Sequence, residues 1–535
     1  MKKYRLPVYA LVTFVALLSG GWLLQRSDSE YARAYERANL FQEVLEHIAR
    51  FYVDSLDEAE LYEMAIDGML SELEDPYTRF LRANEVRDLT LSTTGNYGGL
   101  GIRIDVRDEW ITIITPLADT PAERAGLRPA DRIVEVEGAS TRGWSSERAV
   151  GELKGEPGTP VNIKINRPGY PELLPYSITR ALIHVSSVEI ATMLSEQVGY
   201  VALSTVSETS AAEVEEAVTE LRSRGARALI FDLRNNPGGI LAQGVEVVDL
   251  FLERGKLVVE TRGRAPGASR TYRSTNDPRW PDMPLVVLVN QLSASAAEII
   301  SGALQDHDRA LIVGAPTFGK GMAQLVFRLG DNEALRVTTS RWFTPLGRSL
   351  NRRSRLAEDL LVAAIPVNGD STGEMSEDSG AVYLTASGRQ LRGGGGINPD
   401  VVIGNDQLSE EERAFAIALG TKVPVFRDVL TGYAVELRGN GDWPSDEITV
   451  TNVMRAEVLR RLRARDVPLS DSEWEAAQTV VERQMTYELA RYLFGRDREA
   501  ELRAGDDAHI QRALELLEEA GTQEELLAQV VVGLD

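Results

Sequence analysis

Three short segments of this chain combine hydroxyl, amine and glycine residues in patterns that suit nucleophilic catalysis. The first segment, Asn290 to Glu298, leaves an apolar run and enters a predicted helix. A serine at such a turn is exposed at the sheet edge, beside N–H groups that can stabilise an oxyanion. Ser295 is therefore a candidate nucleophile. Ser295 and Glu298 also form an S-x-x-E pair, so an ordinary helix cap is the alternative, and on this segment alone it is favoured.

The second segment places a lysine, Lys320, between two glycines, with Phe318 and Met322 close by. Burial in partly apolar surroundings lowers a lysine pKa because it disfavours the charged form. A drop from about 10.4 to about 7 costs roughly 4–5 kcal/mol, so the fold must enforce it. A neutral Lys320 would serve as a general base, whereas an exposed turn lysine is the alternative. A P-loop is excluded because Gly321 stands where that motif needs Ser or Thr.

The third segment runs from Phe231 to a Pro237-Gly238-Gly239 turn that follows a predicted buried strand. Two successive glycines let the backbone approach a ligand closely and direct its N–H groups inward. Alone, this segment indicates no more than an ordinary turn.

The composition excludes several other classes of site. The 535-residue chain has no cysteine, so disulfides, thiolate metal sites and cysteine nucleophiles are absent. Its four histidines, His47, His184, His307 and His509, show no metal-binding spacing, and we expect no metal or other cofactor. A net charge of −23 argues against a nucleic-acid partner. A Ser-His-Asp triad through His184 or His307 stays open, although the acidic neighbours of His307 favour a surface loop.

The N-terminus predicts export from the cytoplasm. Basic residues precede an apolar run over residues 6–24, whose length nearly matches the roughly 20 residues that span a bilayer. We favour an uncleaved signal anchor over a cleaved signal peptide, because the run is long and lacks a clear cleavage site. The protein is then a single-pass protein of a bacterial inner membrane, with its catalytic part in the periplasm or another extracytoplasmic space.

The pattern of apolar residues divides the rest of the chain into four regions and predicts a multidomain α/β protein. Apolar runs at 200–203, 228–233, 285–290, 312–313 and 335–338 predict strands that alternate with helices in a largely parallel sheet. The expected boundaries are an anchor at 1–25, a helical region at 26–92, a β-rich unit at 93–182, an α/β core at 183–405 and a helical region at 406–535.

Taken together and in this order, the three segments resemble the C-terminal processing (carboxyl-terminal, tail-specific) serine proteases. The likeness rests on a D-L-R-x-N-P-G-G-like segment, an S-A-S-A-[SA]-E segment and a T-F-G-K-G-x-x-Q segment. It extends to Asp75-Pro76-Tyr77-Thr78, to a PDZ domain that begins near Gly98, and to blocks at 344–349 and 393–400. It implies that the unit at 93–182 is a PDZ domain and that the core at 183–405 is the serine protease. The resemblance covers about residues 40 to 405, and residues 406–535 carry no motif that we can assign.

The resemblance implies a role for each matching residue. Ser295 matches the nucleophile, Lys320 the general base, and Gln324 the residue that orients the lysine. The backbone N–H groups that match the oxyanion hole belong to Ala296 and to Gly238 or Gly239. The PDZ residues that match the binding loop for a substrate's C-terminal carboxylate are Gly98, Gly99, Leu100 and Gly101. Ala297, Met322 and Ala323 depart from the usual pattern without removing a catalytic group.

The resemblance implies partners and leaves one alternative function. The expected substrates are proteins or peptides with exposed C-termini, and the helical ends are candidates for contacts in a homodimer or with an adaptor protein. The alternative is an exported PDZ scaffold with an inactive protease fold, which loss of Ser295, Lys320 or Gln324 would indicate. All three residues are present.

Overall fold

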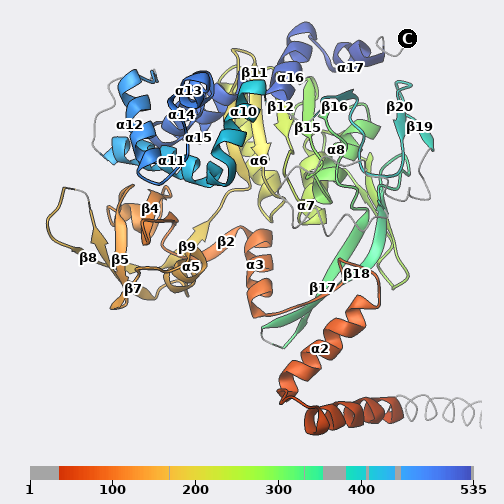
Figure 1. Ribbon diagram of the computed structural model, residues 1–535. Helices are drawn as coiled ribbons and strands as arrows, with labels where there is room; N and C mark the ends of the chain where they lie inside the picture. The colour runs from red at the N-terminus through yellow and green to blue at the C-terminus, as the bar shows by residue number, and fades with distance from the viewer. Residues whose placement is uncertain are drawn as a thin grey trace, which may run out of the picture. The chain divides into compact units, whose positions relative to one another are not determined.

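The computed structural model describes residues 35–167, 169–330, 332–352, 381–404, 409–439 and 448–531. The chain forms two compact units, Met1–Arg82 with Val326–Thr338 and Ala83–Leu325 with Thr339–Asp535 (Figure 1). The predicted anchor at 1–25 lies outside the described residues. Among the residues that are described, no helix is both long enough and apolar enough to cross a membrane.

The centre of the larger unit is a six-stranded sheet in the order β10-β11-β12-β15-β16-β21. Strands β11 to β21 run parallel, and the edge strand β10 is antiparallel to β11. Strands β12, β15 and β16 are buried throughout, as the continuous apolar runs predict for a sheet covered on both faces. The strands are β10 Val188–Met193, β11 Val198–Leu203, β12 Ala228–Asp232, β15 Leu285–Val289, β16 Leu311–Gly314 and β21 Val401–Val402.

Helices cover both faces of this sheet. Because strand side chains alternate between faces, Leu229 and Phe231 pack with α6 (Ser210–Ser223), α7 (Leu241–Asp249) and α8 (Ala296–Asp306). Ala228 and Ile230 pack on the opposite face with α16 (Ala508–Glu519) and α17 (Gln523–Val531). The apolar side chains of α16 are therefore part of the core, and the predicted α/β class is confirmed.

The predicted strand at 335–338 lies outside the parallel sheet. It forms part of β18 (Glu333–Phe343), which pairs antiparallel with β1 (Arg79–Leu81) in the smaller unit. In the larger unit, residues 341–343 of β18 pair antiparallel with β13 (Leu257–Arg262), which also pairs with β14 (Arg270–Arg273). The sequence predicted a strand here, but its pairing partners are distant in the chain. Other described elements are β17 (Met322–Leu329), α2 (Glu58–Ser71), α3 (Ala83–Thr94), and the hairpin of β19 (Val382–Leu384) with β20 (Gln390–Arg392).

The PDZ domain is a small sheet in the order β3-β4-β5-β7-β8, with β6 beside β5. A two-stranded ribbon of β2 (Asn96–Gly99) and β9 (Ala181–His184) joins the domain to the core. Strand β3 lies at one edge of this sheet. The remaining elements are β3 Ile102–Arg107, β4 Trp110–Pro116, α4 Pro121–Arg124, β5 Arg132–Val136, β6 Ala139–Ser140, α5 Ser146–Leu153, β7 Pro160–Asn166 and β8 Leu174–Thr179.

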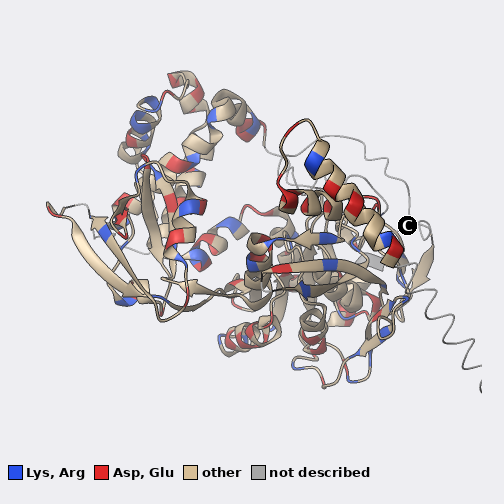
Figure 2. Ribbon diagram, turned by 90° about the horizontal axis from the view of Figure 1, so that it is seen from below, with Lys and Arg blue, Asp and Glu red and all other residues tan. Residues whose placement is uncertain are grey.

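A helical bundle with its own apolar core follows the protease sheet in sequence. Two of its helices begin with capping boxes, Ser409 with Glu412 and Ser470 with Glu473. Lysine and arginine residues are interspersed with acidic residues along the helices of the chain (Figure 2). The helices of the bundle are α10 Glu410–Leu419, the short 3₁₀ helix η1 Gly420–Lys422, α11 Val423–Gly439, α12 Asn452–Arg463, α13 Asp471–Ala476, α14 Gln478–Leu493 and α15 Arg496–Ala504.

Candidate active site

Ser295 is the N-cap of α8, directly after the loop that leaves β15. Its backbone has φ 55° and ψ −114°, a conformation that a residue with a side chain adopts only when its surroundings impose it. The preceding loop is held to the loop after β12, because Ser293 Oγ donates to the Leu233 carbonyl at 2.7 Å. The Ala294 N–H also donates to the Asn236 carbonyl at 2.9 Å. The first and third sequence segments therefore meet at the carboxyl ends of neighbouring strands.

Glu298 joins the first segment to the second. Its side chain is fully buried, and its Oε2 accepts from the backbone N–H of Ser295 at 2.8 Å and of Lys320 at 2.9 Å. Its Oε1 accepts from Thr317 Oγ1 at 2.5 Å and from the Gly319 N–H at 2.7 Å. Burial raises the pKa of Glu298, and these four hydrogen bonds oppose that rise. The sequence indicated only a helix-capping glutamate at this position.

The loop that carries Lys320 packs closely against other backbone segments. A Cβ at Gly319 would lie 3.0 Å from the Leu350 carbonyl oxygen, and one at Gly321 would lie 2.9 Å from the Asn351 nitrogen. The indole N–H of the buried Trp342 donates to the Lys320 carbonyl at 3.1 Å. The loop is thus fixed on both sides of the lysine. Lys320, Phe318, Met322 and Gln324 are all partly buried, and Gln324 lies on β17.

Gly238 lies directly against the Ser295 turn. Its φ is 89°, and a Cβ here would lie 2.5 Å from the Ala294 carbonyl oxygen, 2.7 Å from the Ala296 nitrogen and 2.8 Å from the Ser295 Cβ. Only glycine permits this approach. The Gly238 N–H donates to Asn236 Oδ1 at 2.8 Å. Gly239, with φ 152°, lies against the Val206 carbonyl oxygen.

The Asp-Leu-Arg part of the third segment forms a polar cluster with residues that the sequence did not single out. Arg234 pairs with Asp232 at 2.6 Å and with Asp507 at 2.8 Å, although Asp507 lies 273 residues further along the chain. The Tyr200 hydroxyl donates to Asp232 Oδ2 at 2.8 Å, and burial raises the pKa of Tyr200. The start of α16 therefore helps to hold the loop that ends in Gly238 and Gly239.

His184 and His307 contact groups other than Ser295. His184 contacts Glu213 Oε1 through Nε2 at 2.7 Å and Asn96 Oδ1 through Nδ1 at 3.0 Å. His307 Nε2 contacts the Leu257 carbonyl at 2.6 Å. Neither contact supports a triad through Ser295. Burial raises the pKa of Glu213, but hydrogen bonds from Thr209, Ser187 and others outweigh it and bring the pKa to about 2.

The glycine-rich loop of the PDZ domain leads into its edge strand. Gly98 and Gly99 end β2, Leu100 is buried, and Gly101 precedes β3 with φ 75°. A Cβ at Gly101 would lie 2.4 Å from the side chain of Thr120, so a larger residue would displace this packing. The loop therefore makes a close turn against Thr120.

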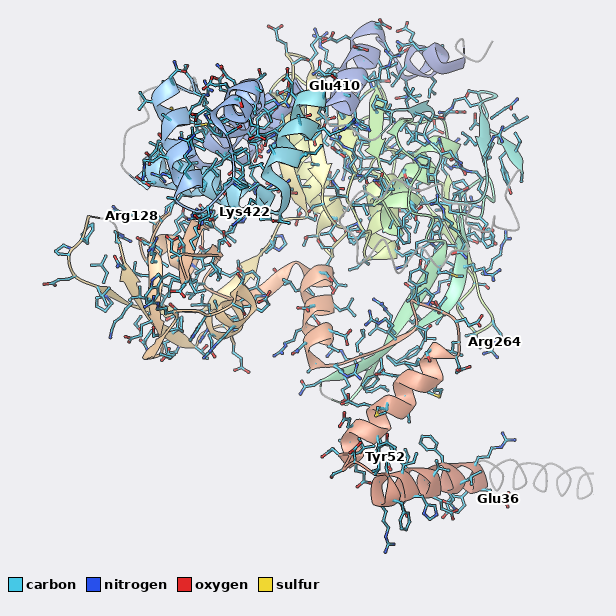
Figure 3. The ribbon with its side chains drawn as sticks, viewed as in Figure 1. Glu36, Tyr52, Arg128, Arg264, Glu410 and Lys422 are labelled. Atoms are coloured by element: carbon cyan, nitrogen blue, oxygen red, sulfur yellow. The ribbon has the colours of Figure 1, made fainter. Side chains whose placement is uncertain are left out.

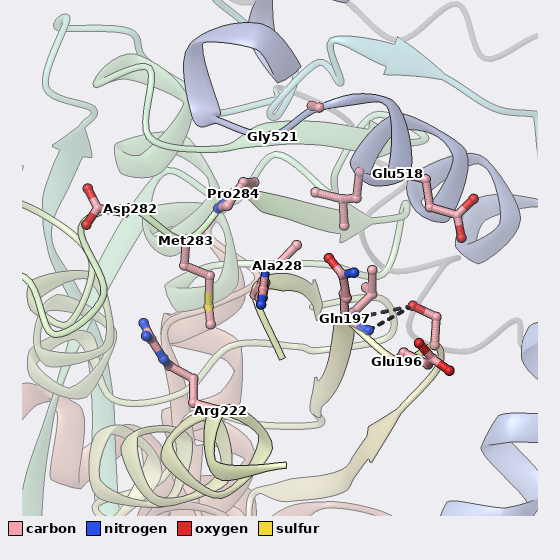
Figure 4. A pocket seen from close by; sticks show the side chains of 14 residues that line it. Glu196, Gln197, Arg222, Ala228, Asp282, Met283, Pro284, Glu518 and Gly521 are labelled. Carbon is pink, nitrogen blue, oxygen red and sulfur yellow. Dashed lines mark hydrogen bonds between the residues drawn. The ribbon is translucent and has the colours of Figure 1, made fainter. Parts of the chain in front are cut away.

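A hollow lies at the opposite end of the sheet, where the strands begin. It has a volume of about 790 Å³ and is bordered by Gln197, Ala228 and Pro284, at the amino ends of β11, β12 and β15 (Figure 4). A second hollow of about 490 Å³ is bordered by Asp232, Arg234 and other residues at the carboxyl ends. Ligands of parallel sheets bind at the carboxyl ends of the strands. The candidate site therefore lies at the end of the sheet that Asp232 and Arg234 border.

Three regions of the chain match known protein families. The chain matches peptidase family S41 over residues 197–362, the PDZ domain over 88–166 and the N-terminal domain of the activating protease CtpB over 21–84. It is 36% identical over 320 residues to a carboxy-terminal-processing protease of Bartonella bacilliformis, covering 59% of this chain and 73% of that protein. It is 30% identical over 361 residues to the carboxy-terminal processing protease CtpA of Bacillus subtilis, covering 66% and 76%.

A solved structure, the photosystem II D1 C-terminal processing protease, is 31% identical and covers 58% of this chain and 89% of that one, with a TM-score of 0.33. The protein belongs to the family of carboxy-terminal-processing serine proteases, peptidase family S41, and carries a PDZ domain.

A prediction arises from the contact of Gly238 with the Ser295 turn. We expect Gly238→Ala to lower kcat by at least about 10²-fold, the cost of losing one oxyanion donor, because the new Cβ must push the two loops apart. Gly255→Ala is the matched control, since Gly255 has φ 85° but nothing within 4 Å of an added Cβ. Both variants should lose about 1–2 kcal/mol of stability from the left-handed backbone. Equal kcat in the two variants, with cleavage and thermal unfolding measured together, would contradict the prediction.

Proposed function

We propose that this protein is an endopeptidase that cleaves exported proteins near their C-termini with a Ser295–Lys320 dyad. The observation that carries the proposal is the shared carboxylate oxygen of Glu298, which accepts from the N–H of both residues. Two amides bonded to one oxygen belong to loops that cannot move independently. A nucleophile and its base need such a fixed relation.

The proposed reaction has two stages. Neutral Lys320 takes the proton of Ser295 Oγ as the oxygen attacks the scissile carbonyl carbon, and Gln324 orients the lysine. The Ala296 N–H and the Gly238–Gly239 turn stabilise the oxyanion, for which Gly238 would exchange its bond to Asn236. The lysine then protonates the leaving amine, which departs and leaves an acyl-enzyme on Ser295. Water, deprotonated by Lys320, hydrolyses the ester and restores the serine.

The PDZ domain would bind the substrate's C-terminal tail. The tail would add as a strand to the edge of β3, and its carboxylate would meet N–H groups of the loop from Gly98 to Gly101. The half-buried Ile102, Ile104 and Val106, which pack on the core of the domain, suit a tail with apolar side chains. The basic and apolar N-terminus supports anchoring in the membrane with the protease outside the cytoplasm.

Labelling with a serine-reactive phosphonate probe tests this proposal. We expect the probe to modify Ser295 of the full chain, as peptide mass spectrometry would show, and modification to fall at least tenfold in Lys320→Ala. A folded protein whose Ser295 is not labelled would support the inactive scaffold instead. Equal labelling in both proteins would contradict the role of Lys320 but not that of Ser295.

A further inference from the structure

One face of the PDZ domain is covered by helices of the C-terminal region. Alternate residues of a strand point to opposite faces of its sheet. Along β4, Ile111 and Ile113 enter the PDZ core, whereas Ile114 belongs to the apolar core of the helical bundle and is only 4% exposed. Thr112, on the same face as Ile114, is also 4% exposed. A PDZ domain alone in solvent would expose this face.

Charged groups continue the same contact at the end of β3. Arg107 is only 8% exposed, and its Nε lies 3.4 Å from Asp105 and 3.7 Å from Asp428 on α11. Arg465, just after α12, pairs with Asp428 and also with Asp108 of the PDZ domain at 3.3 Å. A buried arginine needs such partners because desolvation of an unpaired charge is costly.

The shape of α11 also fits the PDZ domain. Gly432 lies within α11, where glycine is unfavourable by about 1 kcal/mol relative to alanine. A Cβ at Gly432 would lie 3.3 Å from the Arg107 guanidinium. The helix therefore carries a weak helix former at the point where Arg107 reaches it. The PDZ domain and the helices lie side by side here, with β4 next to α11 in Figure 1, and Figure 3 labels Arg128 of the domain and Lys422 of the helices.

The last helix of the same group, α15, contacts the protease sheet. Glu501 on α15 accepts from Thr192 Oγ1 of the edge strand β10 at 2.8 Å. Arg496, the first residue of α15, pairs with Glu189 on β10. The helices from α10 to α15 thus contact the PDZ domain through α11 and α12 and the protease sheet through α15. The three family matches end at residue 362, so none of them assigns a role to these helices.

We propose that the helices α10 to α15, which we call the helical platform, hold the PDZ domain at a set position against the protease core. The chain enters the PDZ domain near Asn96 and leaves it near His184, and these two segments link the domain covalently to the core. The platform adds a third attachment, at the end of β3. If β3 receives the substrate tail, as proposed above, the platform determines where that tail lies relative to Ser295.

Thiol cross-linking tests the platform directly, because the chain has no cysteine of its own. In the full chain, Arg107→Cys with Asp428→Cys places one thiol on each side of the contact. We expect a short bis-maleimide to join them at least tenfold faster than in the control pair Lys164→Cys with Asp428→Cys. Lys164 lies in the same domain on β7, two strands away from β4. Equal rates in the two pairs would overturn the proposal. The readout needs no catalysis, so it is independent of the proposed function.

A second variant asks whether the apolar contact holds the domain in place. Adding Ile114→Asp to the first pair should lower the cross-linking rate at least tenfold, while hydrogen exchange shows β5 and β7 still protected. An unchanged rate would overturn the proposal. If Ile114→Asp unfolds the PDZ domain, Gly432→Leu makes the same test from α11 without altering that domain. In protein that keeps Ser295 and Lys320, Gly432→Leu should change kcat/KM at least fivefold for a tailed substrate and less than twofold for a short peptide. Equal changes would overturn the positioning role.

Discussion

Lys320→Ala is expected to lower kcat for a tailed protein substrate by at least about 10³-fold, within the range that a positioned general base contributes. Ser295 then has no group to take its proton, and the acyl-enzyme cannot form at a useful rate. Lys320→Arg is the sharper variant, because it keeps the positive charge and much of the side-chain volume but cannot give up a proton at neutral pH. We expect it to be as inactive as the alanine variant.

The pH dependence gives a second measurement on the same residue. If the neutral amine is the active form, kcat/KM of the wild type rises with pH until the lysine has lost its proton. Lys256→Ala is the control, since Lys256 is a surface lysine of the same unit that pairs with Glu253 at 3.5 Å. It should keep wild-type activity. Wild-type activity in Lys320→Arg would show that another group removes the proton from Ser295.

Glu298→Gln is expected to lower kcat by at least about 10²-fold, comparable to the loss of a well-placed stabilising donor. All four groups that face this side chain are donors, two at each oxygen. A carboxylate accepts all four, whereas a glutamine presents its NH₂ group to two of them. One pair of donors then loses its acceptor, and the two loops separate. The measurement is kcat together with thermal unfolding.

The matched control for this substitution is Glu412→Gln. Glu412 occupies the same position of a capping box on α10, away from the candidate site, and its substitution should leave kcat unchanged. Acid should act on Glu298 in the same direction as the substitution. Burial raises its pKa, so protonation, and with it loss of activity, begins at a higher pH than for an ordinary carboxyl group. Protonation of Glu298 has the opposite effect on the free energy of unfolding. A folded-state pKa that lies above the unfolded value stabilises the folded protein at low pH, and this contribution is lost as the pH rises through the folded-state pKa. Full activity in Glu298→Gln would refute the bridging role.

The three segments could be identified from the sequence. The contacts of their residues could be predicted only in part, because some partners are local in the sequence and others are distant. Ser295 and Glu298 looked like a cap because a cap depends on residues three positions apart, and local sequence records such contacts well. The Glu298 carboxylate does accept from the Ser295 N–H. It also accepts from three donors that arrive 19 to 22 residues later. No local pattern can indicate this closure, since it depends on how two loops meet above the sheet.

Strands could likewise be predicted from local sequence, whereas their pairing partners could not. The apolar runs of β12, β15 and β16 predicted buried parallel strands, because a sheet covered on both faces requires them. The strand at 335–338 was predicted, yet its pairing with β1 and β13 was not, because pairing depends on residues far away in the chain. The pairing of Arg234 with Asp507 and the contact of Ile114 with the helical bundle belong to the same category.

The types and spacing of residues were enough to identify three candidates for chemistry: a serine at a strand-to-helix turn, a lysine between glycines and a double-glycine turn. They were also enough to predict the α/β class, because the periodicity of apolar residues reflects which faces are buried. The junction of the serine and lysine loops at a buried glutamate became visible only in the folded protein. A buried carboxylate is stable only where several donors converge on it, and those donors come from loops that the fold alone brings together.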